Sequence, residues 1–191
     1  MYSIDRKYIN ESIVKKSKFI SIIMPYNNNI NKILEHIKKE YKGATHYTYA
    51  YKTRNSKKYS DDGEPSMTAG FPILEALEEK ELTDVVCVVI RFYGGIKLGT
   101  GGLRRAYKTS ALEVINKCDI KKSQEKRLLK ITFDYNNTNE VMNILKNYIT
   151  EEEIFKDDVT LKVYVDIDFD IEKIIPHCKS VEEIKKAFIL I

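Results

Sequence analysis

One stretch of the sequence decides the fold of its first half: DVVCVVIRFYGGIKLGTGGLRRAY, residues 84–107. It opens with the longest apolar run of the chain, Val85–Ile90. Because this run is short and rich in β-branched residues, it predicts a buried strand over 84–93. Five of the chain's eight glycines then fall between Gly94 and Gly102. A helix is predicted beyond them, over 102–117, so the stretch indicates a strand, a glycine-rich loop and a helix in succession.

The glycine-rich loop has the composition of an anion-binding site. Glycine permits positive φ and lets a ligand approach the backbone amides closely, and the N-terminus of the following helix offers unpaired N–H groups. The residues predicted to contact an anion are Arg91, Lys97, Gly99, Thr100, Gly101, Gly102, Arg104 and Arg105. The loop matches neither the Walker A motif nor G-x-G-x-x-G. The alternative interpretation is a strand-to-helix turn whose glycines serve only tight packing.

The rest of the first half is predicted to alternate strands and helices. Apolar residues recur with a helical period over 29–41, whereas tyrosines alternate over 45–52 as they would on a strand. The predicted elements are strands within 12–26, a helix over 29–41, a strand over 45–52, a polar loop over 54–62, and a helix from Ser66 or Thr68 to about Lys80.

The second half is predicted to be a separate, smaller domain. The polar segment 120–127 lacks apolar periodicity, and the domain boundary is placed there, giving domains 1–122 and 123–191. The predicted elements are a strand over 128–134, a helix over 138–148, strands over 151–155 and 159–167, a helix over 170–178 and a strand over 185–191. This βαββαβ order is typical of a ferredoxin-like sandwich. The predicted fold class is therefore α+β with two domains.

Composition and charge restrict the class of protein. With 43% hydrophobic and 31% charged residues, the chain has the composition of a folded soluble protein. No apolar run approaches the ~18 residues of a membrane span, and the N-terminal residues lack a secretory signal, so we expect a cytoplasmic protein without membrane contact. The three cysteines are isolated, which argues against a zinc site or a disulfide framework, and no cofactor is expected.

The charge is unevenly divided. Residues 1–125 carry 22 Lys/Arg against 15 Asp/Glu, a net charge of +7, whereas residues 126–191 carry 10 against 13, a net charge of −3. This asymmetry indicates that an anionic partner meets the first half, unless it reflects only the uneven distribution of solvated charges.

An acidic run precedes the second predicted helix. Asp61, Asp62 and Glu64 lie within four residues and could hold Mg²⁺, with Asp61 and Asp62 as the metal ligands, or act as acid and base. His46, Asp62 and Glu64 are the candidate catalytic residues. Equally, Asp-Gly is a turn signal, and acidic groups are favoured near a helix N-terminus.

A tyrosine-rich strand supplies a second kind of candidate. On the strand over 45–52, Tyr47, Tyr49 and Tyr51 share one face. Aromatic rings beside basic residues can stack the bases of a single-stranded nucleic acid. The alternative is that these rings cover a half-buried core.

Together, the runs His46–Tyr51, Asp61–Gly70 and Arg91–Tyr107 resemble the signature of the Impact/YigZ family, as does Lys16-Ser17-Lys18-Phe19. The resemblance implies that the first domain has the fold shared by domain IV of elongation factor G and a ribosomal-protein domain, and that the second resembles domain V of that factor. It attaches no secure enzymatic activity. Two departures are Met67, where the family usually has glycine, and Arg104, where it more often has an apolar residue.

The leading hypothesis is a translation-related regulator that binds RNA or the ribosome, without DNA specificity, and we expect binding rather than catalysis. The alternatives are an enzyme that binds a small phosphorylated ligand or nucleotide with Mg²⁺, and an adaptor for a protein partner. Convergence of His46, Asp62, Glu64, Lys97 and Arg104 on one pocket would favour the enzyme. Basic residues spread along an open face with the tyrosines would favour RNA.

Overall fold

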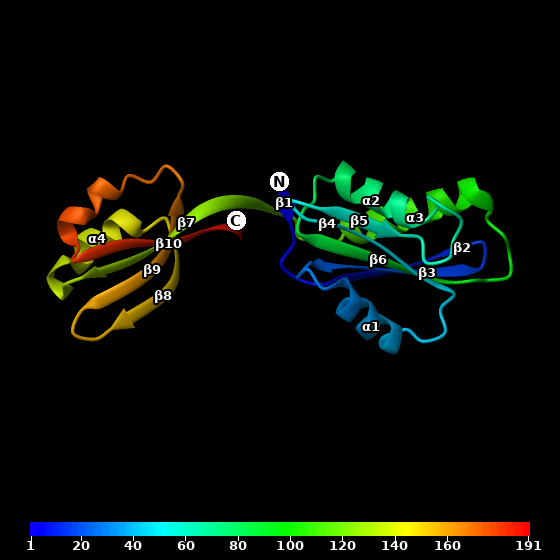
Figure 1. Cartoon of the computed structure of the whole chain (residues 1–191), viewed down its shortest axis with the longest axis horizontal. Helices are drawn as coiled ribbons and strands as arrows, with labels where there is room; N and C mark the ends of the chain where they lie inside the picture. Colours follow the sequence, from blue (N-terminus) through cyan, green and yellow to red (C-terminus); the bar gives the residue numbers. More distant parts are fainter. The chain divides into compact units, whose positions relative to one another are not determined.

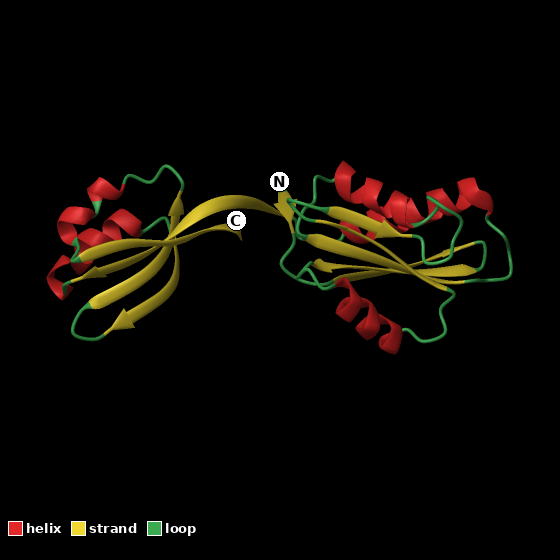
Figure 2. Cartoon of the chain, in the orientation of Figure 1, coloured by secondary structure: helices red, strands yellow, loops and turns green.

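The computed structural model describes residues 1–191 and divides the chain into two compact units, Met1–Lys122 and Ser123–Ile189 (Figure 1). We call them the first and the second unit. Each combines one β-sheet with helices (Figure 2), so the chain is an α+β protein.

The first unit is built on a five-stranded sheet in which all neighbours run antiparallel. In spatial order its strands are β2 (Tyr8–Val14), β3 (Ser17–Pro25), β6 (Val85–Phe92), β4 (His46–Lys52) and β5 (Lys57–Ser60). β6 lies at the centre, where both faces of a strand are covered. It can do so because every residue from Val85 to Arg91 is buried, the continuous pattern expected of such a strand.

Helices cover both faces of this sheet (Figures 1 and 2). α1 (Ile30–Glu40) lies on one face, whereas α2 (Gly70–Glu79) and α3 (Gly99–Ile115) lie on the other. Since side chains alternate between the two faces along each strand, the first unit has two separate apolar layers. Tyr107 belongs to the layer under α2 and α3, and Tyr49 belongs to the layer under α1.

The strand register gathers three strand ends beneath the start of α3. Arg91 on β6 is paired with Phe19 on β3 and with His46 on β4. Ser17 begins β3 at the same end of the sheet. The chain leaves β6 here and enters α3 after the glycine-rich loop, so polar residues from distant parts of the sequence meet.

Three predictions for the first half need correction. The predicted polar loop 54–62 contains β5, an edge strand with one side open to solvent, which tolerates a polar sequence. α2 begins at Gly70 without a side-chain cap from Ser66 or Thr68. α3 begins at Gly99 rather than Gly102, so the last glycines of the loop form the first helical turn.

The second unit has a sheet in the order β10-β7-β9-β8. Its elements are β7 (Lys121–Phe133), the 3₁₀ turn η1 (Tyr135–Asn137), α4 (Thr138–Leu145), β8 (Ile149–Phe155), β9 (Val159–Asp166) and β10 (Ser180–Leu190). Buried and partly exposed residues alternate along the whole of β9, which confirms the half-buried strand predicted there. β7 begins earlier than predicted because its first two residues pair with β1 (Tyr2–Ser3).

The helix predicted over 170–178 is wrong. This segment forms two 3₁₀ turns instead, η2 (Ile171–Lys173) and η3 (Ile175–His177). Pro176 explains the difference, since it has no N–H for a helix and disfavours the α conformation of the preceding residue. None of the helices in the structure combines the length and hydropathy that crossing a bilayer requires.

Candidate functional site

Four polar side chains meet beneath the start of α3, and we call them the Glu64 cluster: His46, Glu64, Arg91 and Tyr107. Arg91 Nη1 and the Tyr107 hydroxyl each donate to Glu64 Oε1, both at 2.7 Å. His46 Nε2 lies 3.7 Å from the same oxygen. Arg91 and Glu64 are only 5% and 9% exposed. A buried carboxylate of this kind is stable because a cation and a hydroxyl donor both serve it.

Tyr107 acts in this cluster as a permanent donor. Burial and the neighbouring Glu64 carboxylate raise the pKa of its phenol far above the usual value. The phenol therefore stays protonated at physiological pH and holds Glu64 in place. Its ring packs edge-on against Phe19, with the ring centroids 5.3 Å apart.

Arg91 is not fully satisfied by these contacts. Its Nη1 donates to Glu64 and its Nη2 donates to Ser17 Oγ at 3.3 Å. Its buried Nε–H has no acceptor. Because buried donors are nearly always paired, this N–H group is available to an acceptor on a bound molecule.

The His46 ring is fixed in one orientation. Its Nδ1 lies 2.7 Å from the backbone carbonyl oxygen of Asp62, which can only accept, so Nδ1 carries the hydrogen. In the neutral ring Nε2 therefore presents a lone pair toward Glu64 and the adjoining hollow. His46 is placed by the turn that contains Asp62, not by a neighbour in sequence.

The acidic run is a structural turn. Asp61 accepts three backbone N–H groups, from Met67 at 2.8 Å, Ala69 at 2.9 Å and Gly70 at 2.8 Å, and so caps α2. Asp62 Oδ2 accepts from Tyr47 N at 2.6 Å. These contacts fit the turn interpretation of the acidic run, and no group of three His, Cys, Asp or Glu side chains that could hold a metal ion is present.

The glycines of the loop have two different tasks. A Cβ on Gly94 would lie 1.9 Å from the carbonyl oxygen of Lys16, so Gly94 is needed where the turn between β2 and β3 presses against the loop. Gly99 has a φ of +71° and begins α3. No side chain caps this helix, which leaves the first-turn N–H groups open to an external acceptor.

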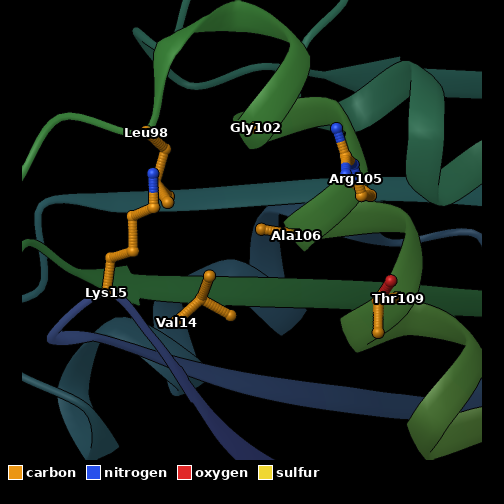
Figure 3. A pocket seen from close by; sticks show the side chains of 7 residues that line it. All are labelled: Val14, Lys15, Leu98, Gly102, Arg105, Ala106 and Thr109. Atoms are coloured by element: carbon orange, nitrogen blue, oxygen red, sulfur yellow. The ribbon is translucent and has the colours of Figure 1, made fainter.

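Three adjoining hollows surround the first turns of α3. The first, which we call the His46 pocket, has a volume of about 430 Å³ and is lined by Thr45, His46, Glu64, Pro65, Arg91, Tyr93, Lys97, Leu98, Gly99, Thr100 and Leu103. The second, of about 350 Å³, is shared between the turn at Lys15 and the helix residue Arg105 (Figure 3). The third, of about 490 Å³, contains Arg104, Arg105 and Lys108.

Cations without partners gather around these hollows. Lys15, Lys16, Lys97 and Arg105 make no ion pair or side-chain hydrogen bond in the structure. Arg104 differs, because it donates to the Met67 carbonyl at 3.1 Å and to the Glu75 carboxylate at 3.3 Å. We call the four unpaired cations and the first turn of α3 the basic face.

The matched part of the sequence coincides with this site. The family described as the Impact N-terminal domain matches residues 15–115, a span that runs from Lys15 to the last residue of α3 and contains the whole basic face and the Glu64 cluster. The chain belongs to the IMPACT family. The Impact/YigZ resemblance predicted from the three motifs is thereby confirmed.

Curated relatives support this assignment, and a solved structure shares the fold. The chain is 34% identical to the IMPACT family member YvyE of Bacillus subtilis over 164 residues, which is 82% of this chain and 76% of the relative. It is 35% identical to an IMPACT family member of Haemophilus influenzae over 148 residues, 74% of this chain and 72% of the relative. YigZ of Escherichia coli is 37% identical over 101 residues, 49% of this chain and 50% of the relative. A crystal structure of a hypothetical protein has a similar fold, with a TM-score of 0.65 at 24% identity over 92% of this chain and 89% of that one.

The structure brings together only part of the predicted site. His46, Glu64, Arg91 and Lys97 line one pocket with Gly99 and Thr100. Arg91, which was predicted to contact phosphates, is buried against Glu64 because β6 carries it under α3.

The three tyrosines predicted either to stack bases or to cover a core lie on the face of the sheet opposite to α3. Tyr49 is 8% exposed under α1. Tyr51 stacks on Tyr26 with ring centroids 4.3 Å apart, and the Tyr47 hydroxyl donates to the Tyr41 carbonyl. Their face of the sheet is the one that α1 covers, so the core interpretation holds for them.

Two contributors were not predicted. Lys15 and Lys16 form the turn between β2 and β3, with φ of 44° and 67°. Such a turn normally shows Asn-Gly or Asp-Gly in the sequence, and Lys-Lys gives no such signal. Ser17 was also missed, although its Oγ accepts from Gly94 N and from Arg91.

Proposed function

We propose that this IMPACT family protein is a cytoplasmic, translation-related regulator that binds RNA or the ribosome through the basic face. The observation that carries the proposal is the set of four unpaired cations around an uncapped helix start. Unpaired cations attract phosphates without first losing an internal partner. The first-turn amides of α3 add directional donors for a phosphate oxygen.

Backbone strain at the basic face supports a binding role. Lys15 and Lys16 both adopt positive φ, a conformation that costs free energy for residues with a Cβ. Glycine or asparagine would relieve this cost at either position. Retention of two lysines in a strained turn is understandable if their charges serve a ligand.

We also propose that the first unit corresponds to domain IV of elongation factor G and the second to domain V, each folding as a domain of its own. A tandem of this kind suits a protein that works on the ribosome.

The predicted alternative of an Mg²⁺-dependent enzyme receives no support from Asp61 and Asp62, since both hold backbone amides of the turn. One observation favours the other part of this alternative, the binding of a small phosphorylated ligand. His46, Glu64 and Lys97 converge on one pocket, and a pocket suits a small ligand better than it suits an extended RNA strand.

The test is binding of purified 70S ribosomes and of an unstructured oligoribonucleotide over a salt series. The double variant Lys97→Ala/Arg105→Ala should flatten the slope of log K against log salt by about 1.4, because each phosphate contact to a single strand contributes about 0.7. The matched control is Lys32→Ala/Lys117→Ala, which removes the same charge from exposed positions outside the basic face. Absence of binding at low salt sinks the proposal. Binding to a ribosomal fraction that survives nuclease treatment would indicate a protein partner instead.

A further inference from the structure

The His46 pocket differs in character from the two other hollows around α3. Its walls are largely apolar, formed by the side chains of Pro65, Leu98 and Leu103. The Tyr93 ring, 45% exposed, stands at its edge. A volume of about 430 Å³ lies within the range of roughly 300–1,000 Å³ that is usual for small-molecule sites. Apolar walls of this size suit a flat ring rather than a bare phosphate.

His46, Glu64 and Arg91 give this pocket two acceptors and one unmet donor. His46 Nε2 offers a lone pair in the neutral ring, because Nδ1 donates to the Asp62 carbonyl. Glu64 offers its carboxylate, held in place by Arg91 and Tyr107. Arg91 is 5% exposed and lines the pocket, yet its Nε–H has no acceptor. These groups complement a ring that carries N–H donors beside an acceptor.

Another part of the pocket lining suits a phosphate. It consists of Lys97, Gly99 and Thr100. Lys97 has no carboxylate partner, and no side chain caps the helix that begins at Gly99. An anion at this position meets a free ammonium group and the positive end of the α3 dipole.

We propose that the His46 pocket binds a single nucleotide, with the base against Tyr93 and Leu103 and the phosphate on Lys97 and the first turn of α3. The nucleotide comes either from an RNA strand on the basic face, in which case this assignment rests on the proposed function, or from solution as a free monophosphate. Because His46 and Glu64 both accept hydrogen bonds, bases with an exocyclic amine, which offers two N–H donors, are preferred over uracil, which offers one donor at N3.

The experiment titrates the full chain with AMP, GMP, CMP, UMP and inorganic phosphate, and follows amide chemical shifts of α3 and β6 by NMR. At least one amino-bearing nucleotide should bind tenfold or more tightly than UMP and than phosphate. Tyr93→Ala should weaken that binding roughly tenfold, the effect of losing one stacked base. Lys97→Ala should weaken nucleotide and phosphate alike, whereas His46→Gln should reduce the preference over UMP.

Arg105→Ala is the matched control, because Arg105 belongs to the basic face but does not line the His46 pocket. It should weaken RNA binding and leave AMP, GMP and CMP binding unchanged. Salt-dependent RNA binding without any nucleotide response overturns this inference and leaves the proposed function standing. Nucleotide binding without RNA binding overturns the proposed function, supports this inference and identifies the free monophosphate as the source. Equal binding of inorganic phosphate and nucleotides, or an unchanged affinity in Tyr93→Ala, also overturns the inference.

Discussion

Basic side chains are used differently in the two units. Around the start of α3, Lys15, Lys97 and Arg105 have no carboxylate partner. In the second unit, Lys126 pairs with Asp166, and Lys179 contacts both Asp134 and Asp158. The difference teaches that the number of lysines and arginines does not locate a binding surface. What distinguishes the basic face is that its unpaired charges lie close together around the uncapped start of α3.

The largest effect should follow from breaking the one buried ion pair under the basic face. Glu64→Ala leaves Arg91 buried without its counter-charge, which we expect to cost about 3–5 kcal/mol. Native-state hydrogen exchange of the β6 amides measures this loss of stability in the first unit, separately from the second. Asp166→Ala, which removes a partly exposed pair in the second unit, should change the exchange of β9 by only about 0–1 kcal/mol. Equal losses in the two variants would contradict the distinction between the pairs.

A smaller loss of stability is expected when the turn that carries Lys15 and Lys16 is pushed away from the glycine-rich loop. Gly94→Ala places a Cβ 1.9 Å from the Lys16 carbonyl oxygen, so backbone must shift, at a cost of about 1–3 kcal/mol. Gly101→Ala has open space around the new methyl group and should stabilise α3 by about 0.5–1 kcal/mol. Thermal unfolding of the two variants separates the packing glycine from the helical one. Similar melting temperatures for the two variants would show that the loop backbone accommodates a Cβ at Gly94 without loss of stability.

Stability and binding should move in opposite directions at the Lys15–Lys16 turn. The variant Lys15→Asn/Lys16→Gly relieves two positive φ angles and should stabilise the first unit by about 0.5–2 kcal/mol. It also removes two cations, so its RNA affinity should fall by about as much as that of Lys97→Ala/Arg105→Ala. Lys162→Gln, which removes a paired lysine of the second unit, should leave RNA affinity unchanged. A stabilised variant with full RNA affinity would exclude the turn from the basic face.

The smallest expected effect concerns the reactivity of the cysteine thiols, which should be equally low in the two units. Burial raises the pKa of Cys118 in the first unit and of Cys178 in the second, each to about 11. Since the thiolate is the reactive form, a disulfide reagent should react slowly with both at pH 7, and the rates should rise as the pH approaches 11. Mass spectrometry after a pH series measures each site. A midpoint of the reaction rate near pH 8.5 at Cys178 alone would show that this thiol is more accessible to solvent than Cys118.

Residues with a strong local signal were predicted correctly. The apolar run 85–90 became the central strand because six consecutive apolar residues can be buried on both faces. The helix at 29–41 and the strand at 45–52 were also confirmed, since their periods are clear. Predictions were wrong where a neighbour decided the outcome. β5 is a strand because β4 offers it an edge, and Tyr49 is buried because α1 packs over it.

For the candidate site, the sequence by itself determined the glycine-rich loop, its cations and the family, because these depend on residue type and order. The tertiary structure decided which cations remain free. Arg104 and Arg105 are neighbours in the sequence, but a helix turns them in different directions: Arg104 pairs with Glu75, whereas Arg105 lines the pocket beside Lys15. Likewise, Glu64 and Arg91 are far apart in the chain and meet only because strand register and the Asp61 turn bring them under α3. Pairing and burial depend on distances between remote residues, and no local pattern of residues contains those distances.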